Sequence, residues 1–150
     1  MRIAIGSDHA GFDLKQEIGP VIEGEGHDVI DVGTTSTEST DYPIYAAKAA
    51  KMVADGEADR AVLVCGSGVG VSIVANKVDG VRAVHGHDPE EAEMARRHNN
   101  ANVLTLAGRR MEANEAEPII ERFLGTDFEG GRHERRVSEI GAVERGEELG

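Results

Sequence analysis

The sequence has no tryptophan, only three phenylalanines and two tyrosines among 150 residues, and a single cysteine. With so few aromatic residues, a hydrophobic core must be built from aliphatic side chains. One cysteine cannot form a disulfide within the chain, which fits a reducing cytoplasm. Residues 1–8 contain too short an apolar run for a signal peptide or a membrane span, and we expect a strand there.

Positive charge is also scarce, because the formal net charge is -12. A surface of this kind argues against nucleic acid or an anionic membrane as a partner, since both require basic patches. If the substrate is an anion, the few positive charges must be gathered at one place. Only four of the 16 basic residues are lysine, so the excess is in arginine, which suits bidentate phosphate binding.

Short apolar runs alternate with helical patterns along the whole chain. Strands are expected at residues 2–7, 27–32, 60–64, 81–84 and 103–106. Helices are expected after the loop at 8–11, from about 41 to 56, after the glycines at 66–70, from 88 to about 97, and from 114 to 125. This alternation predicts an α/β protein with a five-stranded parallel sheet covered on both faces, a three-layer αβα Rossmann-like sandwich. No linker or repeat divides the chain, so we expect one domain over residues 1–150.

Two segments depart from a regular pattern. Gly19-Pro20 interrupts the first expected helix, so we expect a kink or an early end there. Residues 130–150 form a C-terminal arm whose stripe of Val137, Ile140 and Val143 has no strand after it. A stripe this narrow suits either a partner subunit or the surface of the same domain.

The third strand leads into a glycine loop, in which Gly66, Gly68 and Gly70 follow Cys65 at every second position. Such loops let several backbone N–H groups converge on one point and favour negative charge. The same field favours a thiolate at Cys65, which would place a base beside an oxyanion hole. The alternative is that Cys65 is a small buried hydrophobic residue at the end of a strand.

In a parallel sheet the site lies beyond the carboxyl ends of the strands. Those ends carry Asp8 and His9, the glycine loop, His85 with His87, and Arg109. Asp8 has the alternative role of capping the helix after its loop. The two histidines lack a further metal ligand and fit a charged turn better than a metal site.

Other basic side chains lie further along the chain. Arg132 and Arg136 are i, i+4 neighbours in a helix and present two guanidinium groups on one face, a suitable clamp for a phosphate. The alternative is a solvated face paired with nearby glutamates. His98 suits a proton donor near neutral pH, or a histidine placed at a helix end by the helix dipole.

Two nucleotide-binding motifs fail to match. Glycines 66, 68 and 70 follow the third strand in a G-x-G-x-G pattern, whereas a dinucleotide site needs G-x-G-x-x-G after the first. Gly6 and Gly11 have the spacing of a nucleotide-phosphate loop, but Phe12 stands where that motif needs lysine. We therefore expect no nucleotide cofactor.

Several motifs occur together in one order along nearly the whole chain. They are Ser7-Asp8-His9-Ala10-Gly11-Phe12-x-x-Lys15, Thr40-Asp41-Tyr42-Pro43, Cys65-Gly66-Ser67-Gly68-Val69-Gly70, Ala75-Asn76-Lys77, His98-Asn99 and Gly130-Gly131-Arg132-His133-x-x-Arg136. In this combination the chain resembles the B-type ribose-5-phosphate isomerases and their galactose-6-phosphate and allose-6-phosphate isomerase relatives.

The resemblance implies a metal-free aldose–ketose isomerase without a cofactor, which interconverts ribose 5-phosphate and ribulose 5-phosphate through an enediolate. It makes Cys65 the base between C1 and C2, and His98 the group that opens the sugar ring. Stabilisation of the enediolate oxygen falls to Ser67 and to the backbone of Gly66, Gly68, Val69 and Gly70. Contacts to the sugar hydroxyls fall to Asp8, His9 and Asn99, and contacts to the phosphate to Arg109, Arg132 and Arg136.

The chain departs from parts of the family pattern. Some members carry a glutamate base four residues after the loop serine; that position is Val71 here, which leaves Cys65 as the base. Ser67 stands where cysteine-type members often have threonine, and it keeps the hydroxyl. The resemblance also implies a homodimer or a dimer of dimers with shared sites, towards which the C-terminal helix would extend.

Two other functions fit the same residues. One is an isomerase of a different sugar phosphate, such as allose 6-phosphate, galactose 6-phosphate or a tetrose phosphate. The other is a non-catalytic sugar-phosphate sensor. The presence of Cys65 and His98 argues against the sensor, because a protein that only binds needs neither a base nor a proton donor.

Overall fold

The computed structural model describes residues 1–150 and shows five strands alternating with helices. The strands are β1 (Arg2–Ser7), β2 (Asp28–Asp31), β3 (Arg60–Cys65), β4 (Ala83–His85) and β5 (Val103–Ala107). The helices are α1 (Phe12–Gly24), α2 (Tyr42–Ala54), α3 (Val69–Ala75), α4 (Pro89–Asn99), α5 (Ala113–Gly125) and α6 (Arg132–Glu144). The alternation expected from the hydrophobic pattern is confirmed.

All five strands are parallel and lie in the order β2-β1-β3-β5-β4. The chain therefore winds in one direction from β1 to β2 and in the other from β3 outward. Ligand sites of open parallel sheets lie beyond the carboxyl ends of the strands at such a switch point. Ser7 pairs in register with Val64, so Asp8 and Cys65 leave the sheet side by side at this point.

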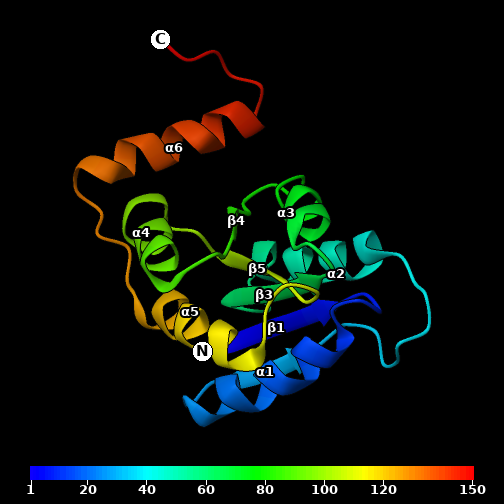
Figure 1. Ribbon diagram of the computed structural model, residues 1–150. Helices are drawn as coiled ribbons and strands as arrows, with labels where there is room; N and C mark the ends of the chain where they lie inside the picture. The colour runs from blue at the N-terminus through cyan, green and yellow to red at the C-terminus, as the bar shows by residue number, and fades with distance from the viewer.

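Helices cover both faces of the sheet (Figure 1). One face packs against α1, α4 and α5 through a cluster of 17 buried residues, and the other against α2 and α3 through a cluster of 12. Phe123 is the only aromatic residue in either cluster. The expected three-layer arrangement and the aliphatic core are both confirmed.

Helix α1 runs through Gly19-Pro20 to Gly24, so the early end expected there is wrong. A proline inside a helix costs about 3 kcal/mol. Ile18 and Ile22 are completely buried on the core side of the helix, and burying each side chain contributes about 1.5–3 kcal/mol. Pro20 itself is exposed. The buried face therefore holds the helix together across the proline.

Other element ends differ from the expected ones by one or two residues. Strand β4 starts at Ala83, and Val81 and Arg82 precede it without regular secondary structure. Helix α5 is capped by Glu112 instead of Asn114: its carboxylate and that of Glu115 form a reciprocal capping box. Glutamate is not among the residues usually found at the N-cap of a helix, and the sequence therefore did not point to Glu112.

Helix α6 lies apart from the sheet and touches the rest of the chain mainly at α4 (Figure 1). Near its end, the Glu144 carboxylate accepts hydrogen bonds of 3.1 Å from the Gly80 N–H. Ile140 and Val143 remain 40% and 60% exposed and line a hollow of about 490 Å³ opposite β4. The apolar stripe is thus only partly covered by its own chain. None of the helices combines the length and the hydropathy needed to cross a membrane.

Candidate active site

Asp8 follows β1 at the switch point and is 6% exposed. Its Oδ1 accepts a hydrogen bond of 3.0 Å from the N–H of Gly11, the residue that precedes α1. A Cβ atom at Gly11 would lie 2.4 Å from the Val64 carbonyl oxygen, so only glycine allows the loop to approach β3 this closely. Asp8 is therefore not the cap of α1, because the N-cap is Gly11 and no side chain caps the helix. Its carboxylate instead fixes the loop before the helix, and this contact occupies one of the two carboxylate oxygens.

His9 extends from the same loop towards the segment before α2. His9 Nδ1 lies 3.1 Å from the Thr40 backbone nitrogen and 3.2 Å from the Thr40 carbonyl oxygen, so the backbone of Thr40 holds this side of the ring in either tautomer. Thr40 Oγ1 lies 2.9 Å from the Tyr45 hydroxyl. The threonine of the Thr40-Asp41-Tyr42-Pro43 motif thus orients the His9 ring and leaves Nε2 without a partner in the chain.

The glycine loop follows β3 as expected. Cys65 is 4% exposed and belongs to the smaller hydrophobic cluster, but its Sγ accepts a hydrogen bond of 3.2 Å from the Gly68 N–H. Gly68 has φ 75°, a left-handed conformation that favours glycine. Cys65 is therefore both a buried residue at a strand end and the acceptor of a loop N–H. A donor in this position stabilises negative charge on the sulfur.

Arg109 lies against the glycine loop from β5. The Gly108 N–H donates to the Cys65 carbonyl over 2.8 Å, and the Arg109 N–H donates to the Gly66 carbonyl over 3.1 Å. A Cβ atom at Gly66 would lie 3.2 Å from Arg109 Nη1. The glycine therefore lets a guanidinium group approach the loop, and that group adds positive charge beside Ser67, whose side chain is exposed.

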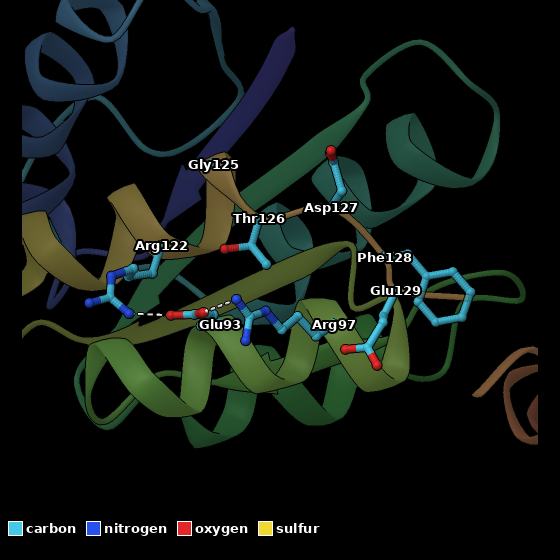
Figure 2. Close-up of a pocket in the computed structure, with 8 residues that line it drawn as sticks. All are labelled: Glu93, Arg97, Arg122, Gly125, Thr126, Asp127, Phe128 and Glu129. Carbon is cyan, nitrogen blue, oxygen red and sulfur yellow. Dashed lines mark hydrogen bonds and ion pairs between the residues drawn. The ribbon is translucent and has the colours of Figure 1, made fainter. Parts of the chain in front are cut away.

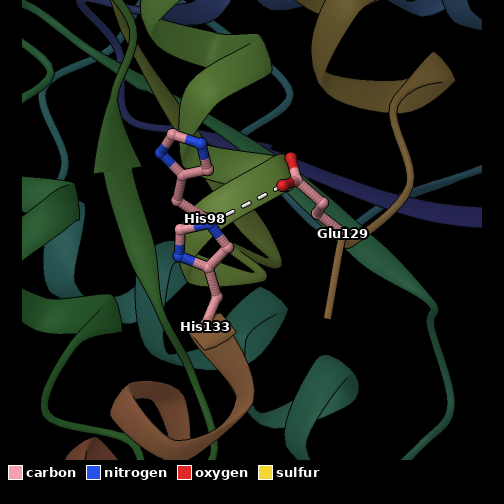
Figure 3. Close-up of side chains that lie close together, drawn as sticks. All are labelled: His98, Glu129 and His133. Carbon is pink, nitrogen blue, oxygen red and sulfur yellow. Dashed lines mark ion pairs between the residues drawn. The ribbon is translucent and has the colours of Figure 1, made fainter. Parts of the chain in front are cut away.

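A second group of expected site residues gathers where α4 ends and α6 begins. His98 stacks on His133, with ring centroids 4.3 Å apart, and His133 Nε2 lies 3.8 Å from Glu129 Oε1 (Figure 3). Burial lowers the pKa of His133, and its neighbours His98, Arg132 and Arg136 lower it further, whereas Glu129 opposes them. Arg132 and Arg136 follow on the same helix, and both are exposed.

The arginine pattern on α6 separates the two interpretations of this charged run. Arg135 forms the i, i+4 ion pair with Glu139 at 2.8 Å that a solvated face would show. Arg132 and Arg136 form no ion pair within the chain. Two guanidinium groups one helical turn apart are thus free to bind an anion.

The chain does not bring its two groups of expected site residues together. Asp8, His9, the glycine loop and Arg109 lie at the carboxyl edge of the sheet. Helix α4 returns the chain to the amino edge, where the Arg82 Nε, just before β4, donates to the Asn99 carbonyl over 3.1 Å. His98 and Asn99 therefore face away from Cys65 of the same chain.

His98, Glu129 and His133 also meet the distance criterion for a metal site, since one ligand atom of each lies within 4.8 Å of the others. The two imidazole planes are inclined by only 17°. Their in-plane lone pairs therefore run side by side instead of converging on one ion, as ligation requires. The arrangement fits a stacked pair better than a metal centre.

A hollow of about 790 Å³ lies between α4 and the segment after α5 (Figure 2). Its two arginines are already paired with one carboxylate: Arg97 Nη2 lies 2.8 Å from Glu93, and Arg122 contacts the same group. No expected site residue lines it.

A smaller hollow of about 430 Å³ lies beside the glycine loop. Residues from the glycine loop, from the end of β4 and from the segment between β5 and α5 line it, among them Ser67, His85 and Arg110.

Thr105 is a polar residue of this region that the sequence pattern did not single out. It lies fully buried within β5 and donates from Oγ1 to the Gly68 carbonyl over 2.8 Å. The available signal was its position: a hydroxyl between Leu104 and Leu106 in a strand buried on both faces needs a hydrogen-bond partner. His85 lies 3.2 Å from the same hydroxyl through Nδ1.

Comparisons with known proteins show the family to which the chain belongs. Residues 3–140 match the family described as Ribose/Galactose Isomerase. The chain is 48% identical over 144 residues to ribose-5-phosphate isomerase B of Escherichia coli (strain K12). This match covers 96% of this chain and 97% of that protein. It is 40% identical over 148 residues to D-erythrulose-4-phosphate isomerase of Pectobacterium atrosepticum, covering 98% and 97%.

The fold leads to the same family. The solved structure of Clostridium thermocellum ribose-5-phosphate isomerase B has a TM-score of 0.95 at 45% identity and covers 97% of this chain and 99% of that one. The family match over residues 3–140 spans the segments that carry both groups of expected site residues. The chain therefore belongs to the ribose/galactose isomerase family and is an aldose–ketose isomerase of the ribose-5-phosphate isomerase B type.

Proposed function

We propose that the protein interconverts ribose 5-phosphate and ribulose 5-phosphate, with Cys65 as the base. The observation that carries this proposal is the hydrogen bond from the Gly68 N–H to Cys65 Sγ, in a loop that Arg109 flanks. A thiolate held by a backbone donor is a base of moderate strength beside groups that stabilise a developing oxyanion. A free thiol also suits a reducing cytoplasm.

The reaction moves one hydrogen between adjacent carbons of the open-chain sugar. The Cys65 thiolate takes the proton from C2 of the aldose, and the electrons of the C2–H bond form the C1–C2 double bond of an enediolate. The negative charge on O1 is held by the Ser67 hydroxyl and by N–H groups of the loop. The thiol then returns a proton to C1, while the O2 proton passes to O1 and the ketone forms at C2.

The remaining residues bind and prepare the sugar. His98 protonates the ring oxygen as the bond from C1 to that oxygen breaks, and the C1 hydroxyl loses its proton to water as the aldehyde forms. Asp8, His9 and Asn99 contact hydroxyl groups. Arg109, Arg132 and Arg136 bind the phosphate, which concentrates positive charge at one point of an otherwise acidic protein.

We propose that each site is shared by two copies of the chain, in a homodimer or a dimer of dimers. One copy supplies Cys65 and Arg109 from its carboxyl edge, and the other supplies His98, Arg132 and Arg136 from α4 and α6. This arrangement explains why the two guanidinium groups on α6 lie free and away from the sulfur of their own chain. In this arrangement the second copy would also cover Ile140 and Val143, which are exposed in the single chain.

A tetrose phosphate is the second candidate substrate. The specific observation is the 40% identity to D-erythrulose-4-phosphate isomerase, spread over nearly the whole length of both chains. The two substrates differ by one carbon between the reacting end and the phosphate. The width of the assembled site decides between them, because the distance from Cys65 to the phosphate clamp must match the sugar.

The test is a coupled assay of the wild type and Cys65→Ala on ribose 5-phosphate, erythrulose 4-phosphate, allose 6-phosphate and galactose 6-phosphate. We expect the highest kcat/KM on ribose 5-phosphate. We expect Cys65→Ala to lose about 10²–10⁴-fold in kcat, as expected for removal of a general base, with little change in KM. Near-normal turnover by this variant would show that another group is the base. Equal turnover of free ribose would remove the phosphate assignment.

A further inference from the structure

Thr105 is the only residue of β5 whose side chain is polar, and it is completely buried. Its Oγ1 donates a hydrogen bond of 2.8 Å to the carbonyl oxygen of Gly68. Gly68 is the residue whose N–H faces Cys65 Sγ over 3.2 Å. A single side chain in the middle of the sheet thus contacts the residue that contacts the sulfur.

His85 completes the chain of hydrogen bonds. It pairs with Thr105 in register between β4 and β5, and its Nδ1 lies 3.2 Å from Thr105 Oγ1. The hydroxyl has one hydrogen, which it gives to Gly68, so its oxygen accepts from His85 and Nδ1 carries the proton. A Cβ atom at Gly68 would lie 2.3 Å from His85 Cε1, so the imidazole ring lies directly against this glycine.

We propose that Thr105 and His85 are positioning residues that hold Gly68 so that its N–H points at the sulfur of Cys65. Gly68 needs such a restraint, because glycine at φ 75° can leave this conformation more easily than any other residue. Anchoring the Gly68 carbonyl fixes the orientation of the neighbouring peptide that carries the N–H. The inference rests on the proposed function only in giving this restraint a catalytic purpose, namely to stabilise the thiolate.

Suitable substitutions at positions 105 and 85 can remove the hydrogen bond while keeping the volume of the side chain, or keep the hydrogen bond. Valine at position 105 keeps the volume of threonine but leaves the Gly68 carbonyl and His85 Nδ1 without a partner. Serine keeps the hydroxyl. At position 85, which is only half-buried, asparagine keeps an N–H donor in place of Nδ1, and leucine removes it.

The experiment measures the ionisation of Cys65 in the substrate-free protein, through the thiolate absorbance at 240 nm as a function of pH. Cys65 is the only cysteine, so Cys65→Ala provides the spectral blank. We expect Thr105→Val and His85→Leu to raise the midpoint, by about one pH unit for Thr105→Val, because a hydrogen bond to the charged form is weakened. Thr105→Ser and His85→Asn should keep the wild-type midpoint.

Turnover supplies the second readout. With ribose 5-phosphate, Thr105→Val should lose about tenfold in kcat at neutral pH while KM changes little, and Thr105→Ser should recover it. His87→Leu is the control, since His87 contacts the His85 ring edge without joining the hydrogen-bond chain. A wild-type absorbance midpoint in both Thr105→Val and His85→Leu would overturn the inference, even if kcat fell. Failure of the proposed function would appear separately, as normal turnover by Cys65→Ala.

Discussion

His98 and His133 stack with ring centroids 4.3 Å apart and ring planes inclined by 17°. The stack joins the last turn of α4 to the first turn of α6. His133 is 5% exposed, whereas His98 is half-buried, so His133 pays the larger cost of becoming charged. Arg132 and Arg136 disfavour its protonation further, and Glu129 alone favours it. We therefore interpret His133 as a neutral ring that supports the imidazole of His98.

The lowered pKa of His133 makes stability depend on pH. Below about pH 6.5 the unfolded chain protonates this histidine while the folded chain does not, so unfolding becomes easier as the pH falls. We expect the urea midpoint of the wild type to decrease between pH 7.5 and 5.0. His133→Gln should show a smaller decrease, and His87→Gln, at an exposed histidine, should keep the wild-type decrease. An equal decrease in His133→Gln would contradict the assignment.

Sharing of the site between subunits predicts complementation. Cys65→Ala and His98→Gln are each expected to be inactive, but a heterodimer of the two contains one site with both residues intact. Random mixing after unfolding and refolding together should restore about a quarter of wild-type activity, because half the dimers are mixed and each has one intact site.

Pairs of variants from one edge of the sheet serve as the control for this experiment. Cys65→Ala mixed with Arg109→Ala should recover nothing, because every site would then lack one of the two residues. Recovery in this control, or none in the mixture with His98→Gln, would indicate that each site is built within one chain.

The sequence pattern predicted the fold well where the signal was local. The apolar run Ala61–Cys65 followed by glycines predicted both β3 and the loop after it. Gly19-Pro20 did not end α1, because burial of the neighbouring isoleucines outweighs the local preference of these residues against a helix. Thr105 was missed because its role depends on contact with Gly68, which is 37 positions away in the chain. The separation of His98 from Cys65 followed only from the direction of α4, and the spacing of motifs contains no such information.

Arg136 and Arg135 offer a matched test of the phosphate clamp, since they are adjacent on α6. Arg136 has no ion-pair partner in its own chain, whereas Arg135 pairs with Glu139 at 2.8 Å. We expect Arg136→Ala to raise KM for ribose 5-phosphate about 10–100-fold, as for loss of a charge-assisted hydrogen bond to the phosphate, with a smaller change in kcat. Arg135→Ala should leave KM within about twofold of wild type. Equal effects of the two variants would indicate a general effect of charge.

Lys15 joins helix α1 to the end of strand β2 through an ion pair with Asp31. Its side chain is 1% exposed, its Nζ lies 2.5 Å from Asp31 Oδ2, and it lies 5.3 Å from the centre of the Phe12 ring. Removing the anion leaves a buried ammonium group without its partner, which costs more than replacing the lysine by an apolar side chain of similar length. We expect Asp31→Asn to lower the free energy of unfolding by about 1–3 kcal/mol, less than for a fully buried pair because Asp31 is 41% exposed. Lys15→Met should change it by less than about 1 kcal/mol, and urea denaturation of the two variants compares them directly. A larger loss in Lys15→Met than in Asp31→Asn would mean that the lysine acts through a contact other than this ion pair.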